Sequence, residues 1–328
     1  MLLSIIMLLG GFVLLIFGSN WLVDGASDLA RRLKISDIVV GLTIVSIGTS
    51  SPELIVNLIA SLNGNTDIAI GNVVGSNIFN VLIILGATAI VMPVSVKSNT
   101  TWKEIPFSFM AAIVIFFLAN DELFNGYPVS EVSRTDGLIL LSFFAIFMAY
   151  TYALARGHNY VPEVNYKKTT ILKSSLLILA GLVGLFFGGR YLVLGAVDIA
   201  LYMGMSESVV GLTIVAAGTS LPELFTSIIA ALKKKADIAI GNVVGSNIFN
   251  IFLILGVSAT VKPLPFNRIN NLDILVMILS SFLMFVFVFT GKGRKIGRVE
   301  GGLFVAMYLV YIGILLTGNH HILEHMFR

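Results

Sequence analysis

Two glutamates stand inside apolar segments of this chain, each within nearly the same short motif. Glu53 lies in GTSSPE and Glu223 lies in GTSLPE, 170 residues further on (223 − 53). A charged side chain at the centre of a bilayer costs about 2.5–3.5 kcal/mol on insertion scales, so an intramembrane carboxylate commonly marks an ion or substrate pathway. A neutral glutamate bonded within its own helix is the alternative, but two equivalent copies surrounded by hydroxyl groups argue against it. The motif therefore predicts a functional carboxylate in each copy.

Each glutamate shares a helical face with other oxygen-bearing groups. Positions i, i+3 or i+4, i+7 and i+11 form one stripe of an α-helix. The first stripe comprises Ser46, Thr49, Ser50, Glu53 and Asn57, and the second comprises Ala216, Thr219, Ser220, Glu223 and Ser227. Each stripe predicts a line of candidate ligands along one face of its own helix.

A proline precedes each glutamate directly. Pro52 and Pro222 have no backbone N–H and clash with the carbonyl four residues earlier, so each is expected to break its helix. The carbonyls around Gly48 and Gly218 are then free. Broken helices are tolerated at membrane depth where the loose backbone lines a cavity or is buried in protein. We therefore expect the backbone oxygens of Ser46 and Ala216 to be additional ligand candidates.

The decapeptide GNVVGSNIFN occurs twice, at residues 71–80 and 241–250. On a helix its first asparagine, its serine and its last asparagine fall at i, i+4 and i+8, which is one polar edge. The edges comprise Asn72, Ser76 and Asn80 in the first copy and Asn242, Ser246 and Asn250 in the second. Beside each edge runs a GxxxG spacing that favours close helix packing; its glycines are Gly71 and Gly75, then Gly241 and Gly245. Asn77 and Asn247 lie off the edge and are expected to pack or to form a hydrogen bond.

The candidate ligands are all oxygen atoms. The chain has no cysteine, and its four histidines lie outside the apolar segments. Carboxylate, hydroxyl, amide and carbonyl oxygens suit hard cations such as Ca²⁺ and Na⁺. Two ionised carboxylates balance one Ca²⁺ or two Na⁺, and competition for one charged site would couple the two fluxes. No cofactor is expected.

The composition indicates a helical membrane protein. Hydrophobic residues make up 57% of the 328 residues and charged residues only 12%. Apolar runs of roughly 18 to 25 residues are long enough to cross a hydrocarbon core, whereas a transmembrane β-barrel would show alternating segments of about 10 residues. The net charge of +3 is attributed to cytoplasmic loops, with no nucleic-acid partner. The first 20 residues lack the basic region and cleavage site of a signal peptide.

The chain is a duplication. Between residues 39–80 and 209–250, 30 of 42 positions are identical. We divide it into a first repeat at 1–156, a short cytoplasmic linker at 157–170 and a second repeat at 171–328. Each repeat is predicted to contain five spans. The ten spans are expected near 2–30, 37–62, 67–92, 103–119, 134–155, 171–201, 207–232, 237–261, 272–290 and 299–317.

An odd number of spans per repeat makes the second repeat enter the membrane from the opposite side. The charges agree, because one side of this topology collects sixteen basic residues and the other only four. The positive-inside rule makes the basic side cytoplasmic and both termini extracytoplasmic. The expected location is the plasma or inner membrane. Inverted repeats are a transporter architecture, with the site at midplane between the repeats.

The paired GTSxPE and GNxxGSNIxN segments resemble the two repeats of the sodium/calcium exchanger family, within the cation/calcium exchanger superfamily. The resemblance covers essentially the whole chain. It implies ten helices in two inverted five-helix repeats and electrogenic exchange of several Na⁺ for one Ca²⁺ by alternating access, with sliding of the long first and sixth spans. The implied ligands are Glu53, Glu223, Thr49, Ser50, Thr219, Ser220, Ser76, Ser246, Asn80, and the carbonyls of Ser46 and Ala216.

Two features depart from parts of that family. Some members carry Asp where this chain has Asn250, and because Asp there is associated with potassium dependence, Asn250 argues against it. The linker of about 14 residues leaves no room for the cytoplasmic calcium-sensing domains of animal exchangers. The chain therefore resembles the prokaryotic type, for which a monomer is expected to suffice for transport.

Three other classes of protein are considered. A proton/calcium antiporter would titrate Glu53 or Glu223 during transport, although relatives of that type carry acidic residues in their GN motifs. A passive channel has less use for inverted halves and long first helices. An intramembrane protease would need a nucleophile with a base, paired aspartates or HExxH within the spans, and these are absent from the sequence. The chain is therefore expected to be a transporter and not an enzyme.

Overall fold

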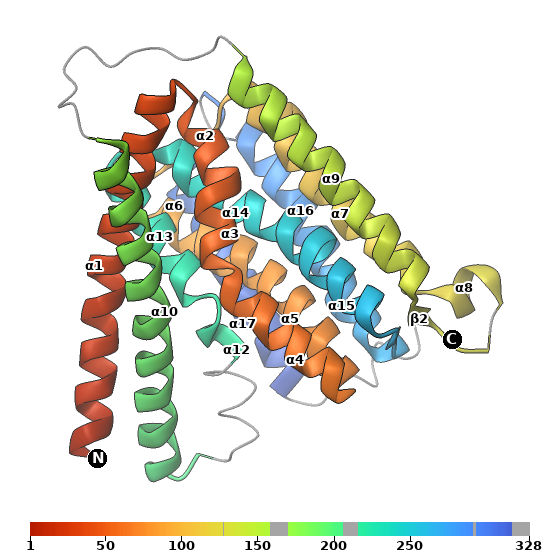
Figure 1. Ribbon diagram of the computed structural model, residues 1–328. Helices are drawn as coiled ribbons and strands as arrows, with labels where there is room; N and C mark the ends of the chain where they lie inside the picture. Colours follow the sequence, from red (N-terminus) through yellow and green to blue (C-terminus); the bar gives the residue numbers. More distant parts are fainter. Residues whose placement is uncertain (127, 158–169, 206–215, 291–292, 317–328) are drawn as a thin grey trace. The chain divides into compact units, whose positions relative to one another are not determined.

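A computed structural model of the chain describes residues 1–126, 128–157, 170–205, 216–290 and 293–316 (Figure 1). Contacts divide the chain into two compact units. Unit 1 comprises Met1–Pro52 and Phe147–Ser246, and unit 2 comprises Glu53–Ile146 and Asn247–Arg328. Each unit combines segments of both sequence repeats, so the division at 157–170 is a feature of the sequence that the contacts do not test.

Most of the described chain is apolar helix. Within the described residues, eight helices are long and apolar enough to cross a membrane, or nine if Asp37–Thr49 and Ser51–Asn63 are counted as one broken span. The expected span at 207–232 begins outside the described residues, which resume at residue 216. The chain is therefore a helical, multi-pass membrane protein, and the total of ten spans stays a prediction.

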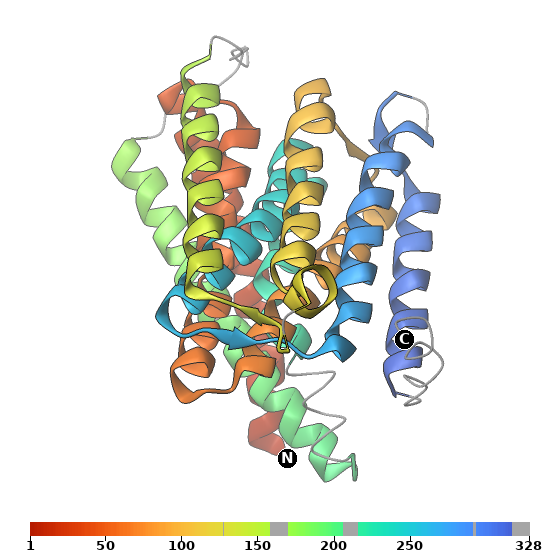
Figure 2. The same ribbon diagram turned by 90° about the vertical axis from the view of Figure 1, so that its right-hand side faces the viewer.

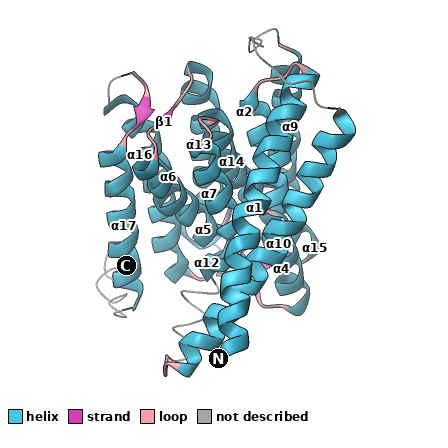
Figure 3. Ribbon diagram, turned by 90° about the vertical axis from the view of Figure 1, so that its left-hand side faces the viewer, coloured by secondary structure: helices cyan, strands magenta, loops and turns pink. Residues whose placement is uncertain are grey.

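Unit 1 contains the two longest helices of the described chain. Helices α1 (Leu2–Leu33) and α10 (Ile171–Tyr202) each have 32 residues, which is about 48 Å of helix at 1.5 Å per residue. Figures 1 and 3 show the two helices side by side. A helix of this length exceeds a 30 Å hydrocarbon core and must tilt or protrude.

Glycines line the contact between α1 and α10. Gly18 lies so close to α10 that an added Cβ would come within 2.8 Å of the backbone nitrogen of Leu185 and 2.9 Å of the carbonyl oxygen of Gly181. Gly11 and Gly25 make similar contacts one heptad to either side. Small residues let membrane helices approach backbone to backbone, which increases van der Waals contact in a solvent that offers no hydrophobic driving force.

The other helices of unit 1 are short and interrupted. The first group is α2 (Asp37–Val40), the π-helical turn η1 (Gly41–Val45) and α3 (Ser46–Thr49). The second group is α12 (Ala216–Gly218), α13 (Leu221–Leu232) and α14 (Ala236–Ile248), whose last two residues belong to unit 2. The rings of Phe12 on α1 and Phe225 on α13 meet edge to face, 5.3 Å apart.

Unit 2 is a bundle of helices that are mostly shorter. Those from the first half of the chain are α4 (Ser51–Asn63), α5 (Thr66–Phe79), η2 (Asn80–Leu85), α6 (Gly86–Val91), η3 (Thr100–Glu104), α7 (Ile105–Leu118), α8 (Asp121–Asn125) and α9 (Arg134–Arg156). Those from the second half are η5 (Phe249–Leu255), α15 (Gly256–Val261), η6 (Arg268–Asn270), α16 (Asn271–Thr290) and α17 (Arg298–Leu316). Helix α4 contributes its first two residues to unit 1, and α9 contributes its last ten, 147–156.

Two short antiparallel strand pairs join the halves within unit 2. Strand β1 (Val94–Ser95) pairs with β4 (Lys295–Ile296), and β2 (Glu131–Val132) pairs with β3 (Leu264–Pro265). The first pair lies at the upper end of the unit in Figure 3, and the second lies at the lower end in Figures 1 and 2. Each pair thus joins a strand of one repeat to a strand of the other.

Candidate cation-binding residues

Glu223 is buried in unit 1 and bonded to a serine from the first repeat. Its side chain is 1% exposed, and its Oε1 accepts a hydrogen bond of 2.8 Å from Ser50 Oγ. Ser50 Oγ also lies 3.0 Å from Ser246 Oγ. A buried carboxylate needs hydrogen-bond donors to offset its lost hydration. Segments that lie 173 and 196 residues apart thus converge on one carboxylate.

Asn242 holds the backbone around Glu223. Its Nδ2 donates to the carbonyl oxygen of Glu223 at 3.2 Å and to Ser227 Oγ at 3.0 Å, while its Oδ1 lies 3.1 Å from Thr49 Oγ1. We call this group the Glu223 cluster; its members are Ser46, Thr49, Ser50, Glu223, Ser227, Asn242 and Ser246.

The glycines of the second decapeptide bring α14 against η1 and α3. A Cβ added at Gly241 would lie 3.1 Å from Gly41 Cα, and one added at Gly245 would lie 2.6 Å from Ser46 Oγ. For Gly71 and Gly75, no described residue comes within 4 Å of an added Cβ. The segment that faces Gly241 contains Gly41. The counterpart of that segment in the second repeat falls within residues 206–215, which lie outside the described residues. The packing role of Gly71 and Gly75 therefore stays a prediction.

Both segments carrying a glutamate are interrupted two residues before the proline. Ser50 has φ −84° and ψ 5°, and Ser220 has φ −90° and ψ 5°, each at a boundary between two helices. Pro52 and Pro222 follow two residues later in the first turn of the next helix. The Ser46 carbonyl oxygen accepts the N–H of Ser50 at 2.9 Å and lies 3.4 Å from Thr49 Oγ1.

Unit 2 holds the other glutamate. Glu53 is 2% exposed and Asn57, one turn later on α4, is fully buried. Asn57 Nδ2 donates to the carbonyl oxygen of Ala69 at 2.9 Å, and its Oδ1 accepts Asn72 Nδ2 at 2.6 Å. This bond between α4 and α5 corresponds in the repeat to the one between Asn242 and Ser227.

Four buried asparagines of unit 2 form two equivalent hydrogen bonds. Asn80 Nδ2 donates to Asn247 Oδ1 at 3.0 Å, and Asn250 Nδ2 donates to Asn77 Oδ1 at 3.0 Å. Asn77 Nδ2 in turn lies 3.3 Å from the carbonyl oxygen of Asn247. The expectation of a hydrogen bond at Asn77 and Asn247 is confirmed. We call Asn77, Asn80, Asn247 and Asn250 the asparagine cluster.

Candidate ligand oxygens of Ser76 and of the asparagine cluster have no hydrogen-bond partner among the described residues. Among the described residues, no hydrogen-bond partner is found for Asn80 Oδ1, Asn250 Oδ1 or Ser76 Oγ, although all three are buried. In unit 1 the same holds, within the described part of the chain, for Glu223 Oε2 and Thr219 Oγ1. Unpaired buried polar atoms are costly and call for an explanation such as an ion. These oxygens are suited to coordinate a hard cation.

Wide helical turns adjoin the asparagine cluster. The π-helical segment η2 begins at Asn80, and η5 begins at Phe249, one residue before Asn250. Such turns are rare and occur frequently at functional sites. These π-helical turns were not predicted from the sequence, because no residue type marks them. The available signal was an asparagine at the start of an apolar run in both copies.

The remaining candidate ligands lie as follows. Ser220 is buried and Thr219 half-buried, both at the break before α13. Ala216 is the first described residue of α12, and the segment that precedes it lies outside the described residues. Within the described residues, His, Cys, Asp and Glu form no group of three that could hold a metal.

Known proteins are similar to this chain in sequence and in fold. A family model described as sodium/calcium exchanger protein matches residues 3–153 and 173–317. The putative antiporter CaxA of Alkalimonas amylolytica is 37% identical, over 97% of this chain and 100% of that protein. The sodium/calcium exchanger MaX1 of Methanosarcina acetivorans is 32% identical, over 95% of this chain and 98% of that protein.

A solved structure agrees as well. The sodium-calcium exchanger NCX_Mj, soaked with Na⁺ and Sr²⁺, is 35% identical and covers 95% of this chain and 98% of its own, with a TM-score of 0.80. Fold and buried oxygen clusters thus define a multi-pass membrane transporter and not an enzyme. The chain belongs to the sodium/calcium exchanger family.

Proposed function

We propose that this protein is a secondary antiporter that exchanges Na⁺ for Ca²⁺ across the membrane. The observation that carries the proposal is the set of buried oxygens without partners among the described residues, namely Asn80 Oδ1, Asn250 Oδ1, Ser76 Oγ and Glu223 Oε2. Relatives named sodium/calcium exchangers support the choice of ions.

The proposed ligands are the oxygens of both repeats. Ca²⁺ takes six to eight oxygen ligands, and Na⁺ accepts the same kind of donor. In unit 1 we assign cation binding to Thr49, Ser50, Thr219, Ser220, Glu223, Ser246 and the carbonyls of Ser46 and Ala216. In unit 2 we assign it to Glu53, Ser76, Asn80 and Asn250. Two carboxylates compensate one Ca²⁺ or two Na⁺, which is why the ions would compete.

The proposed architecture is ten spans in two inverted five-helix repeats, 1–156 and 171–328, joined by the cytoplasmic linker 157–170. The strand pairs of unit 2 support it, because β1 and its sequence equivalent β3 lie at opposite ends of that unit. The excess of basic residues on one side supports a cytoplasmic linker and extracytoplasmic termini in the plasma or inner membrane. The monomer is proposed to be the transporting species.

The proposed exchange is electrogenic, with several Na⁺ for one Ca²⁺, and uses Na⁺ in preference to protons. The asparagine cluster supports Na⁺ coupling, because its amide side chains do not titrate, and Asn250 supports independence from potassium. In this proposal the carboxylates of Glu53 and Glu223 bind metal ions and do not carry protons through the cycle.

The test is uptake of radioactive Ca²⁺ into proteoliposomes. Vesicles loaded with Na⁺ are diluted into Na⁺-free medium, and a second set carries a pH gradient without Na⁺. We expect uptake that is driven by the Na⁺ gradient, that is accelerated by a membrane potential of the appropriate sign, and that is lost in Glu53→Gln and Glu223→Gln.

The matched control is Glu122→Gln. Glu122 is a carboxylate that belongs to neither cluster and forms an ion pair of 2.6 Å with Arg268, and its loss should leave uptake intact. Uptake driven by the pH gradient alone would replace Na⁺ with protons as the coupling ion. Uptake that needs neither gradient would contradict exchange and indicate a pore.

A further inference from the structure

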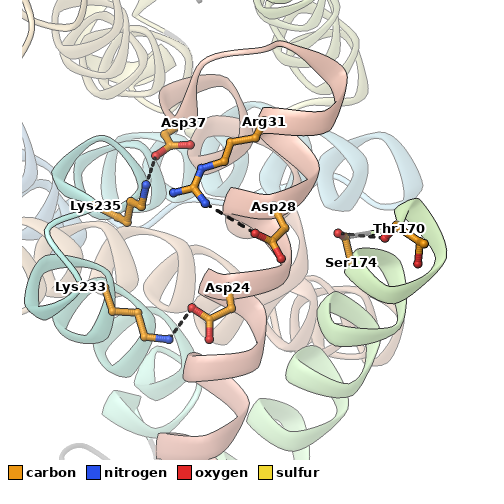
Figure 4. Close-up of polar contacts among 8 residues, drawn as sticks. All are labelled: Asp24, Asp28, Arg31, Asp37, Thr170, Ser174, Lys233 and Lys235. Carbon is orange, nitrogen blue, oxygen red and sulfur yellow. Dashed lines mark hydrogen bonds and ion pairs between the residues drawn. The ribbon is translucent and has the colours of Figure 1, made fainter. Parts of the chain in front are cut away.

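A charged pocket of about 500 Å³ lies within unit 1, at the end of the α1–α10 pair where α1 ends and α10 begins. Figure 4 shows part of its lining, namely Asp24, Asp28, Arg31, Lys233 and Lys235. Its charged lining residues are Asp24, Asp28, Arg31, Lys173, Lys233 and Lys235. The residues come from α1, from the first turn of α10 and from the turn between α13 and α14. The pocket contains no residue of the two clusters proposed to bind cations.

The pocket has an excess of positive charge. Four basic and two acidic side chains line it, which leaves a net charge of +2 (4 − 2). Lys233 Nζ lies 2.7 Å from Asp24 Oδ1, and Arg31 Nη1 lies 3.6 Å from Asp28 Oδ1. Lys235 is balanced from outside the lining by Asp37, at 3.4 Å. With Asp37 counted, the net charge is +1 (4 − 3), and the basic side chain outside these three ion pairs is Lys173.

Two groups in the pocket retain donor capacity. Lys173 is exposed and forms no ion pair with any described residue. Ser27 is 4% exposed, lines the pocket, and its Oγ has no hydrogen-bond partner among the described residues. A buried hydroxyl without a partner is unfavourable and points to a ligand atom that accepts its proton. The pocket therefore calls for an anionic group with oxygen acceptors.

The N-terminus of α10 adds to the attraction. The Thr170 side chain caps α10 by accepting the N–H of Lys173 at 3.2 Å. The first turn of a helix carries partial positive charge from its unpaired N–H groups and favours phosphate-type anions. Figure 4 shows Thr170 and Ser174 at the start of α10, beside the turn of α1 that carries Asp28. Helix dipole, Lys173 and Ser27 thus act on the same pocket.

The pocket lies where a lipid headgroup would lie. It is at the ends of two apolar membrane-spanning helices, α1 and α10. Large apolar side chains are exposed on the same turns, with Leu172 70% exposed, Leu176 56% exposed and Trp21 40% exposed. Tryptophan is enriched at the membrane interface. A ligand could pack its acyl chains against these apolar side chains and place a phosphate in the charged pocket.

We propose that this pocket binds the phosphate group of an anionic phospholipid. Lys173 and Arg31 supply positive charge and Ser27 supplies a hydroxyl donor, while Asp24 and Asp28 orient the neighbouring basic side chains. A lipid in this place contacts both α1 and α10 and so stabilises their seam. The inference does not depend on which ions the protein exchanges, because it concerns binding at a separate pocket.

The test is native mass spectrometry of the purified full chain titrated with phosphatidylglycerol and, in parallel, with phosphatidylcholine. We expect tighter binding of phosphatidylglycerol. Lys173→Gln should weaken that binding roughly fivefold, the change expected from one basic residue near an anionic headgroup. Ser27→Ala should weaken it several-fold without any change in charge, and it stays informative if Lys173→Gln fails to fold.

The matched control is Arg32→Gln, which removes the same charge from an exposed neighbour of Arg31 outside the pocket lining. Its binding should equal that of the unmodified protein. Equal loss in Arg32→Gln and Lys173→Gln, or no loss in Ser27→Ala, would overturn the proposal in favour of diffuse surface attraction. Displacement of the bound lipid by inorganic phosphate at equal concentration would assign the pocket to a soluble phosphate and overturn the lipid.

Discussion

Asn80 Nδ2 donates a 3.0 Å hydrogen bond to Asn247 Oδ1, and 170 residues away in the repeat Asn250 makes the same bond to Asn77. Each bond uses the amide nitrogen of the asparagine at the end of its decapeptide. The carbonyl oxygen of that asparagine is then oriented away from its partner. We therefore expect Asn77 and Asn247 to position the proposed ligands Asn80 and Asn250.

This relationship makes a prediction about Asn247. Asn247→Ala should raise the KM for Ca²⁺ about tenfold with a smaller change in maximal uptake rate, because one buried hydrogen bond contributes about 1 kcal/mol and an unpaired polar group adds to the loss. The measurement is Na⁺-driven Ca²⁺ uptake as a function of external Ca²⁺.

The control is a double-mutant cycle. If Asn247 acts through Asn80, the Asn80→Ala/Asn247→Ala variant should be little worse than Asn80→Ala alone. Additive losses would show that the two residues contribute separately, and the positioning role would then be wrong.

Ser50 and Ser51 offer a matched pair for the Glu223 cluster. Ser50 Oγ lies 2.8 Å from Glu223 Oε1, whereas Ser51 Oγ donates to the Ile47 carbonyl of the preceding turn at 2.8 Å. Ser50→Ala should raise the KM for Ca²⁺ by at least roughly tenfold, because hydrogen bonds to charged groups contribute about 1.5–3 kcal/mol. Ser51→Ala should leave transport nearly unchanged. Similar kinetics in both variants would remove Ser50 from the proposed ligand set.

Gly10 and Gly11 test the seam between α1 and α10. An added Cβ at Gly11 would lie 2.7 Å from the carbonyl oxygen of Gly188, while at Gly10 it would meet no described residue within 4 Å. Gly11→Ala should lower the free energy of unfolding by about 1–3 kcal/mol, the usual effect of overpacking. Gly10→Ala should be neutral or slightly stabilising, since alanine favours helix. Thermal unfolding in detergent measures both, and equal melting temperatures would contradict the close seam.

Asn250→Asp addresses the choice of coupling ions. The substitution replaces the Nδ2 donor with an oxygen that faces Asn77 Oδ1 at the 3.0 Å position of the present bond, so two acceptors meet and a negative charge is added. We expect Ca²⁺ uptake to fall in potassium-free medium and to recover in part when K⁺ is supplied, because a monovalent cation compensates the new carboxylate. Uptake that is equally low with and without K⁺ would rule out this role for the position.

The sequence alone determined the membrane class, the repeat and the identity of the polar residues. These follow from local properties, namely the length of the apolar runs, the 170-residue offset and the helical period that aligns Ser50 with Glu53 or Ser76 with Asn80. Pro52 and Pro222 also located the helix breaks, because proline acts on the backbone of its own segment. For Asn77 and Asn247 the sequence predicted only helix packing or a hydrogen bond, with no named partner.

Only the tertiary structure decided which residues meet. The bonds from Asn80 to Asn247 and from Ser50 to Glu223 join residues 167 and 173 positions apart, and no local period encodes such a pairing. The structure also decided that the compact units are divided at Pro52–Glu53 and Ser246–Asn247, within the motifs themselves. The physical reason is that packing between helices depends on side-chain contacts along whole faces, whereas a sequence repeat records only the order of residues along one chain.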